Sequence, residues 1–352
     1  MKALLTLTLT FLAISSALPL CAQQSFRDLT RNHQHPNAPI TVTVGTSTQN
    51  LSLIGRDARM LYFRDRTGGS IGQPITGIRN LTFVPTAAVN RGLENFRGGN
   101  FEAAVREMGP FVDQLVPYLD LPESNAPELM VQYLIALRES RNFDRAIEIL
   151  RIVPLDAPNT PFVAQIFSLA NRLRMEGRDF MPLIERVPLS PDNTAYVPFM
   201  QQFAELLLEN DLIAEASRIY RRVRDNTSGA ERRWATLWMA YAEVRDQQVL
   251  RTREILNEVG ELDINEPTYS LFYLIESRLA WADRNYDDAL DAISRGIAYA
   301  NVNTSWFPEM LYLSAQAYRL TGNEETAGNV QDYLRMLFPE NYWTKRLERE
   351  GS

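Results

Sequence analysis

From about residue 86 onward, apolar and polar residues follow the period of amphipathic helices, and one pattern recurs along the chain. The stretch RNFDRAIEIL at 141–150 has the same arrangement of polar, apolar and small positions as RNYDDALDAI at 284–293. Copies align on an anchor position, at intervals of 33 to 42 residues, at Phe101, Phe143, Phe180, Ile213, Val249, Tyr286 and Glu324. Three residues past the anchor, the copies share Ala104, Ala146, Ala216, Ala289 and Ala327. Because anchor and alanine share one helix face, the alanine predicts a point where a second helix crosses closely.

The residues around each anchor predict the start of a helix. Asn or Asp precedes the anchor in most copies, at Asn100, Asn142, Asp179, Asn285 and Asn323, where a side-chain oxygen can cap free backbone N–H groups. Acidic residues follow in the first turn, where the helix dipole favours them. Since another amphipathic stretch lies upstream of each anchor, the unit is helix, tight turn, helix. We expect about seven such hairpins over residues 85–346 and a short tail at 347–352. Pro182 and Pro188 should confine the second helix of the third hairpin to little more than one turn.

These units resemble the tetratricopeptide repeat. The resemblance is carried by GNFEAA at 99–104, RNYDDA at 284–289 and a closing proline in LRMLFPEN, and it covers about three quarters of the chain. The signature positions are Phe101, Ala104, Phe143, Ala146, Ala216, Tyr286, Ala289, Ala327 and Pro339. The third and fifth units depart most from the pattern. The resemblance implies a mainly α fold, an α-solenoid of helical hairpins, and a role in binding protein segments rather than in chemistry.

A different pattern precedes the helices. Residues 38–84 contain alternating β-branched and apolar stretches such as ITVTVG and QPITGIRNLTFV, separated by turn residues. They predict three or four strands in a small β module that packs on the helices, since so small a sheet is unstable alone. Residues 23–37 are polar without periodicity and predict a linker. His33 and His35 lie in it, and a two-histidine metal site there is much less expected than solvated side chains.

The N-terminal 22 residues predict a secretory signal peptide. MKALLTLTLTFLAISSALPLCA has one lysine, an apolar run and a small residue before the polar QQS, so we expect cleavage before Gln23. Lipidation of Cys21 is less expected, because Leu20 is bulky where lipoprotein signals have a small residue. Cys21 is the one cysteine of the chain, and an exported protein without disulfides fits a bacterial periplasm. We therefore expect an exported bacterial protein, periplasmic or secreted, that does not span the membrane after cleavage.

Charge and residue types argue against several functions. The formal net charge of −7 gives no general attraction to nucleic acid. The two histidines lie in the predicted linker, so no Ser-His-Asp or Cys-His arrangement fits on the repeats. The glycine-rich RTGGSIG at 66–72 is flanked by predicted strands and reads as a hairpin turn rather than a phosphate loop. We predict no enzyme activity, no metal site and no cofactor.

Two binding hypotheses remain. In the first, the repeats form a scaffold or adaptor that binds segments of other envelope or exported proteins. In the second, the β module contacts an envelope glycan or surface, and the repeats act as a spacer. Aromatic and arginine residues on two successive first helices predict a groove for an acidic segment, at Trp234, Trp238, Tyr241, Arg245, Tyr273, Arg278 and Trp281. The same spacing also fits residues of a helix core. The partner stays open, and homo-oligomers are compatible with the sequence.

Overall fold

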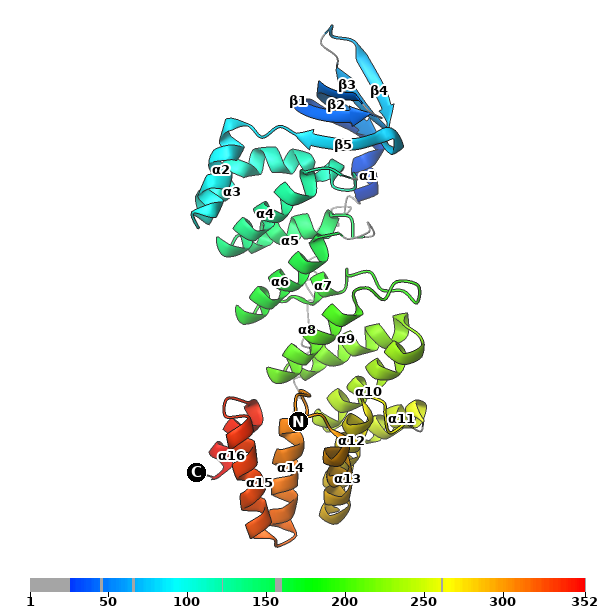
Figure 1. Cartoon of the computed structure of the whole chain (residues 1–352), viewed down its shortest axis with the longest axis vertical. Helices are drawn as coiled ribbons and strands as arrows, with labels where there is room; N and C mark the ends of the chain where they lie inside the picture. Colours follow the sequence, from blue (N-terminus) through cyan, green and yellow to red (C-terminus); the bar gives the residue numbers. More distant parts are fainter. Residues whose placement is uncertain are drawn as a thin grey trace, which may run out of the picture. The chain divides into compact units, whose positions relative to one another are not determined.

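The computed structural model describes residues 26–44, 47–64, 67–121, 123–155, 160–260 and 262–351. The predicted signal peptide lies outside these residues. The described residues fall into two units, which divide between Arg178 and Asp179, and Figure 1 labels their helices and strands. The described part consists of a small antiparallel sheet followed by helical hairpins of tetratricopeptide type, so the predicted fold class is confirmed. Within the described residues, no helix is both long and apolar enough to cross a bilayer.

The sheet of the first unit has its strands in the order β4-β3-β2-β1-β5, all antiparallel neighbours. The strands are β1 (Asn32–Val44), β2 (Ser47–Asp57), β3 (Met60–Arg64), β4 (Ser70–Pro74) and β5 (Ile78–Phe83). Alternation places Ile40, Val42, Leu53, Phe63 and Phe83 on one fully buried face. The opposite face carries polar side chains such as Thr41, whose hydroxyl donates to Asn50 over 3.0 Å. The described sheet thus has five strands, where three or four were expected.

The predicted linker is wrong from residue 26 onward. Helix α1 (Phe26–Arg31) leads directly into β1, and both histidines belong to that strand. His35 is buried, and its ring lies 5.4 Å from that of Tyr118, while the His33 ring lies 5.9 Å from Tyr118. Tyr118 belongs to the 3-10 helix η2 (Asp113–Tyr118). The polar composition concealed this strand because the residue that packs against its histidine rings, Tyr118, lies far along the chain.

An ion pair between a buried arginine and a partly exposed aspartate joins the sheet to the helices. The Arg56 side chain is 2% exposed and lies 2.6 Å from the Asp120 carboxylate, and it also donates to the Pro117 carbonyl. At the β5 edge, the Asn125 amide donates to the Phe83 carbonyl over 3.0 Å and accepts from the Phe83 N–H over 2.9 Å. These contacts satisfy backbone and charged groups that would otherwise be buried without partners. The β module therefore packs as part of the first unit.

The surroundings of His33 predict a pH dependence in this unit. Burial, then His35 and Arg56, lower the pKa of His33 below its ordinary value of 6.5. The unfolded chain then binds more protons than the folded one, so stability falls as the pH drops through 6.5. We expect protection of β1 amides, corrected for intrinsic exchange, to decrease between about pH 7.5 and about pH 5.5. The matched variant His33→Gln should lose this slope, and equal slopes in both chains would contradict the assignment.

The helices follow the predicted hairpin scheme. The first unit contains α2 (Ala87–Arg97), α3 (Phe101–Val112), α4 (Ala126–Glu139), α5 (Phe143–Ile152) and α6 (Phe162–Met175). The second contains α7 (Met181–Ile184), α8 (Val197–Glu209), α9 (Ile213–Asn226), α10 (Gly229–Arg245), α11 (Val249–Val259), α12 (Tyr269–Ala282), α13 (Tyr286–Tyr299), α14 (Phe307–Leu320), α15 (Glu324–Leu337) and α16 (Tyr342–Gly351). The four-residue α7 agrees with the stop expected from its prolines. The predicted tail is wrong, because α16 continues through Gly351 and buries Leu347.

Turn geometry explains the spacing of the repeats. Most anchors are the first residue of a second helix, and the residue two positions earlier has a positive φ, as at Gly99, Arg141, Arg284 and Gly322. A left-handed residue there reverses the chain after the first helix. The cap side chains of Asn285 and Asn323 accept from backbone N–H groups of the next turn over 3.3 and 3.2 Å. The shared alanines Ala104, Ala146, Ala216, Ala289 and Ala327 are all buried, and Pro339 lies exposed just beyond α15.

Candidate protein-binding face of the second unit

Trp238 of α10 is the centre of a buried aromatic cluster. Its ring stacks on that of Tyr220 at 5.5 Å, and its centroid lies 5.5 Å from those of Tyr241 and Trp306. Trp238 is 2% exposed and Tyr241 is 4% exposed. The prediction that these two rings form an open groove floor is therefore wrong. Residues 235–244 of α10 are all buried in the folded chain, so these side chains are not open to a partner while the surrounding helices are in place.

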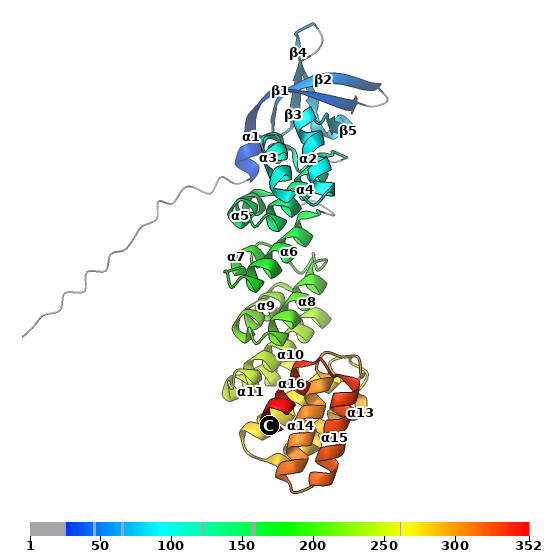
Figure 2. The same cartoon turned by 90° about the vertical axis from the view of Figure 1, so that its left-hand side faces the viewer.

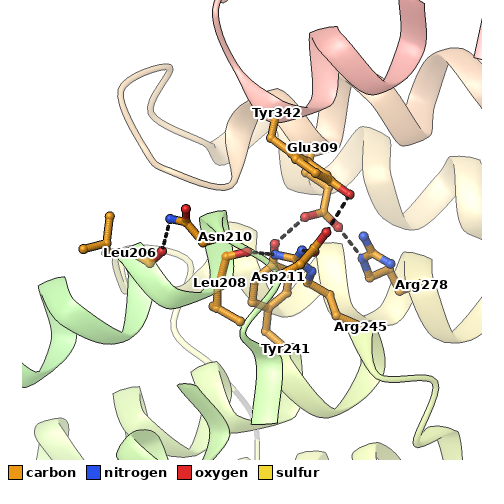
Figure 3. Close-up of polar contacts among 9 residues, drawn as sticks. All are labelled: Leu206, Leu208, Asn210, Asp211, Tyr241, Arg245, Arg278, Glu309 and Tyr342. Atoms are coloured by element: carbon orange, nitrogen blue, oxygen red, sulfur yellow. Dashed lines mark hydrogen bonds and ion pairs between the residues drawn. The ribbon is translucent and has the colours of Figure 1, made fainter. Parts of the chain in front are cut away.

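A charged network lies beside this cluster (Figure 3). The Glu309 carboxylate on α14 is fully buried and accepts hydrogen bonds from the Tyr241 hydroxyl and from Nε of Arg278 on α12. The predicted cation Arg278 is therefore neutralised within the chain. Glu309 did not stand out in the sequence, because a single glutamate in the first turn of an amphipathic helix is ordinary. What identifies it is complete burial, which no sequence pattern displays.

Arg245 at the end of α10 is held by the last turn of α8 and by the turn that follows it. One guanidinium nitrogen donates to the Leu208 carbonyl over 3.1 Å and the other to the Asp211 carboxylate over 2.8 Å (Figure 3). Burial alone would lower the pKa of Arg245, but Tyr241 and Glu309 nearby outweigh it and raise that pKa. Burial, and then Glu309, raise the pKa of the Tyr241 hydroxyl above its ordinary value. Arg245 thus stays charged, and the hydrogen bonds of both arginines hold their guanidinium groups in position.

Helix α16 packs against α14 in the second unit (Figure 2). Its Trp343 ring lies 5.5 Å from the Arg245 guanidinium, 5.4 Å from that of Arg278 and 5.1 Å from the Tyr312 ring. These three residues belong to α10, α12 and α14, which we call the first-helix face of the second unit. The Tyr342 hydroxyl also donates to Asp211 over 3.2 Å. The groove predicted for an acidic partner is occupied by the chain's own C-terminal helix.

Trp234, one helical turn before Trp238, does reach an open surface. It is half-buried and lines a groove of about 620 Å³ together with Gln201, Arg233 and Glu266. Arg233 and Glu266 form an ion pair of 2.7 Å across this groove. Trp234 therefore remains accessible to a partner while α16 is in place.

Tyr273 and Trp281 lie apart from this network, so their predicted place in one aromatic floor is wrong. The Tyr273 hydroxyl lies 3.3 Å from that of Tyr269, and both residues line a hollow of about 490 Å³. The Trp281 ring packs against Tyr286 at 5.1 Å, next to the turn between α12 and α13.

The groups gathered here are suited to binding. Within the described ranges, no group of three or more His, Cys, Asp or Glu side chains could hold a metal ion. Aromatic rings, fixed guanidinium groups and a groove are features that recognise protein segments.

No known protein family matches the sequence, and no curated protein matches it significantly. Solved structures with similar helices include pilF of Pseudomonas aeruginosa, at 14% identity over 75% of this chain and 96% of that chain, with a TM-score of 0.33. PilW, a type IV pilus biogenesis factor, matches at 13% identity over 74% and 96%, with a TM-score of 0.34. A tetratricopeptide repeat protein from Parabacteroides merdae matches at 12% identity over 74% and 95%, with a TM-score of 0.39. The fold assignment rests on the helices of the chain itself.

Proposed function

We propose that the chain is a non-catalytic interaction scaffold of the bacterial cell envelope, which binds helical segments of other exported proteins on the first-helix face of its second unit. The observation that carries this proposal is the packing of α16 on this face. Its Trp343 ring lies 5.5 Å from the Arg245 guanidinium and 5.4 Å from that of Arg278. This packing supports the proposal because the chain's own helix is an example of a segment that this face accepts. Envelope localisation is proposed from the signal-peptide pattern and from the absence of cysteine after residue 21.

The alternative, a glycan-binding β module, has less support. Glycan-binding surfaces of sheets use exposed aromatic rings, and Phe63 belongs to the buried core of the described sheet. Tyr62, on the opposite face, is half-buried, and its hydroxyl donates to Asp57 over 2.6 Å. The polar free face carries Thr and Asn side chains that pair with one another, as Thr43 does with Thr48 over 3.0 Å.

Site-specific photo-crosslinking in the native host tests the scaffold function. A photoreactive phenylalanine derivative in place of Trp234 should give adducts with a defined set of envelope proteins, because this residue lines the accessible groove. The matched control places the same group at Tyr333, a 56% exposed aromatic of α15 outside the first-helix face. Identical adducts at both positions, or none at Trp234, would contradict the proposal.

A further inference from the structure

We propose that α16 is a displaceable occupant of the first-helix face, and that the segment with which it competes is an amphipathic helix with an aromatic anchor and a carboxylate two turns later. This inference rests on the proposed function and adds the kind of partner and its regulation. The pattern is that of α16 itself, in which Trp343 lies over the arginines and Glu350 accepts from the Tyr312 hydroxyl over 2.6 Å.

Helix α16 depends on the face for its own structure. It has 10 residues, and isolated helices shorter than about 12 residues are marginal in water. Its buried side chains are Trp343, Thr344 and Leu347, whereas Lys345 and Glu348 are exposed. The helix therefore has two accessible states: it is folded when bound to the face and largely unfolded when released. A competing helix shifts the equilibrium between these states.

The face beneath α16 is preformed. Arg278 is bound by Glu309 of α14, and Arg245 is bound by the Leu208 carbonyl and by Asp211, so none of these acceptors belongs to α16 (Figure 3). Both guanidinium groups keep their positions when α16 leaves. Another aromatic side chain can then take the place of Trp343 without a cost for ordering the arginines.

The fit of α16 is incomplete. A cavity of about 40 Å³ remains beneath Tyr342 and Trp343, lined also by Trp238 and Glu205. The indole N–H of Trp238 is buried and finds no hydrogen-bond acceptor among the described residues. An occupant whose carbonyl or carboxylate oxygen reaches this indole N–H would make a hydrogen bond that α16 does not make.

A labelled peptide of residues 342–351 tests this inference without any knowledge of the partner. Added to the full chain carrying Trp343→Ala, the peptide should bind at least about tenfold more tightly than to the unaltered chain, because the resident helix no longer competes. The matched variant Tyr333→Ala removes an exposed aromatic from α15 and should bind the peptide like the unaltered chain.

A second variant guards against loss of folding. Glu350→Ala removes the contacts of α16 to Tyr312 and Gln316 without changing a buried side chain, and should give a smaller gain in peptide binding. Absence of peptide binding to both variants while the second unit stays folded would overturn displacement, as would α16 amides that exchange as slowly as those of α14. If the peptide binds but Trp234 gives no crosslinked proteins, the result supports displacement of α16 and overturns the scaffold function. If the unaltered and Trp343→Ala chains give equal crosslinks and neither binds the peptide, the result supports the scaffold function and overturns displacement.

Discussion

Arg278→Met is expected to destabilise the second unit by about 3 to 5 kcal/mol, because it leaves the fully buried Glu309 carboxylate without its cation. Tyr241 would remain as a hydrogen-bond donor and Arg245 as a nearby charge, but neither is a cation in direct contact with the Glu309 carboxylate. Tyr241→Phe removes the weaker partner and should cost about 1 to 3 kcal/mol. Arg278→Met should cost more than Tyr241→Phe, because it removes the cation paired with Glu309, whereas Tyr241→Phe removes only a neutral hydrogen-bond donor.

The double variant Arg278→Met with Glu309→Leu is the decisive control. It removes both charges, so it should recover most of the loss caused by Arg278→Met alone, although both chains lack the contact between Arg278 and Trp343. Tryptophan fluorescence during urea unfolding reports on this unit alone, since the five tryptophans lie at positions 234, 238, 281, 306 and 343. A double variant as unstable as Arg278→Met would show that the loss comes from packing rather than from the buried charge.

Local sequence determined much of the repeat architecture. Asn285 predicted a helix start and caps α13, and Ala289 predicted a close crossing and is fully buried there. These predictions work because capping and helical periodicity involve residues within one turn of each other. Gly99 and Gly322 also mark the left-handed turn before a second helix, but Arg141 and Arg284 hold the same conformation without glycine. At those turns the hairpin packing, rather than the residue type, sets the backbone.

The errors share one physical cause, which is burial by segments distant in the chain. His35 belongs to a polar stretch yet lies against Tyr118, and Trp238 has the spacing of a groove residue yet lies against Trp306. Periodicity shows which side chains share a helix face but not which element covers that face. The seat of Trp343 depends on Arg245 and Arg278, which lie roughly 100 and 65 residues earlier, so no local signal could have shown that α16 occupies the predicted groove.

Ala289→Trp should destabilise the hairpin of α12 and α13 by about 3 kcal/mol. Ala289 has no exposed surface, and its carbonyl accepts from the Ser277 hydroxyl of α12 over 2.9 Å, so the two helices touch at this point. An indole cannot fit between them unless the helices separate, which exposes neighbouring core residues to water. The loss should be local, because each hairpin of a repeat protein contacts mainly its neighbours.

Amide hydrogen exchange measures both the size and the extent of this effect. We expect protection to fall in α12, α13 and the adjoining α14, and to change little in α8 and α9. Ala298→Trp is the matched control, since it introduces the same side chain at an exposed position of α13 and should leave exchange nearly unchanged. Equal protection in the two variants would mean that Ala289 does not mark the crossing, and an increase in exchange throughout the unit would mean that its hairpins unfold together rather than locally.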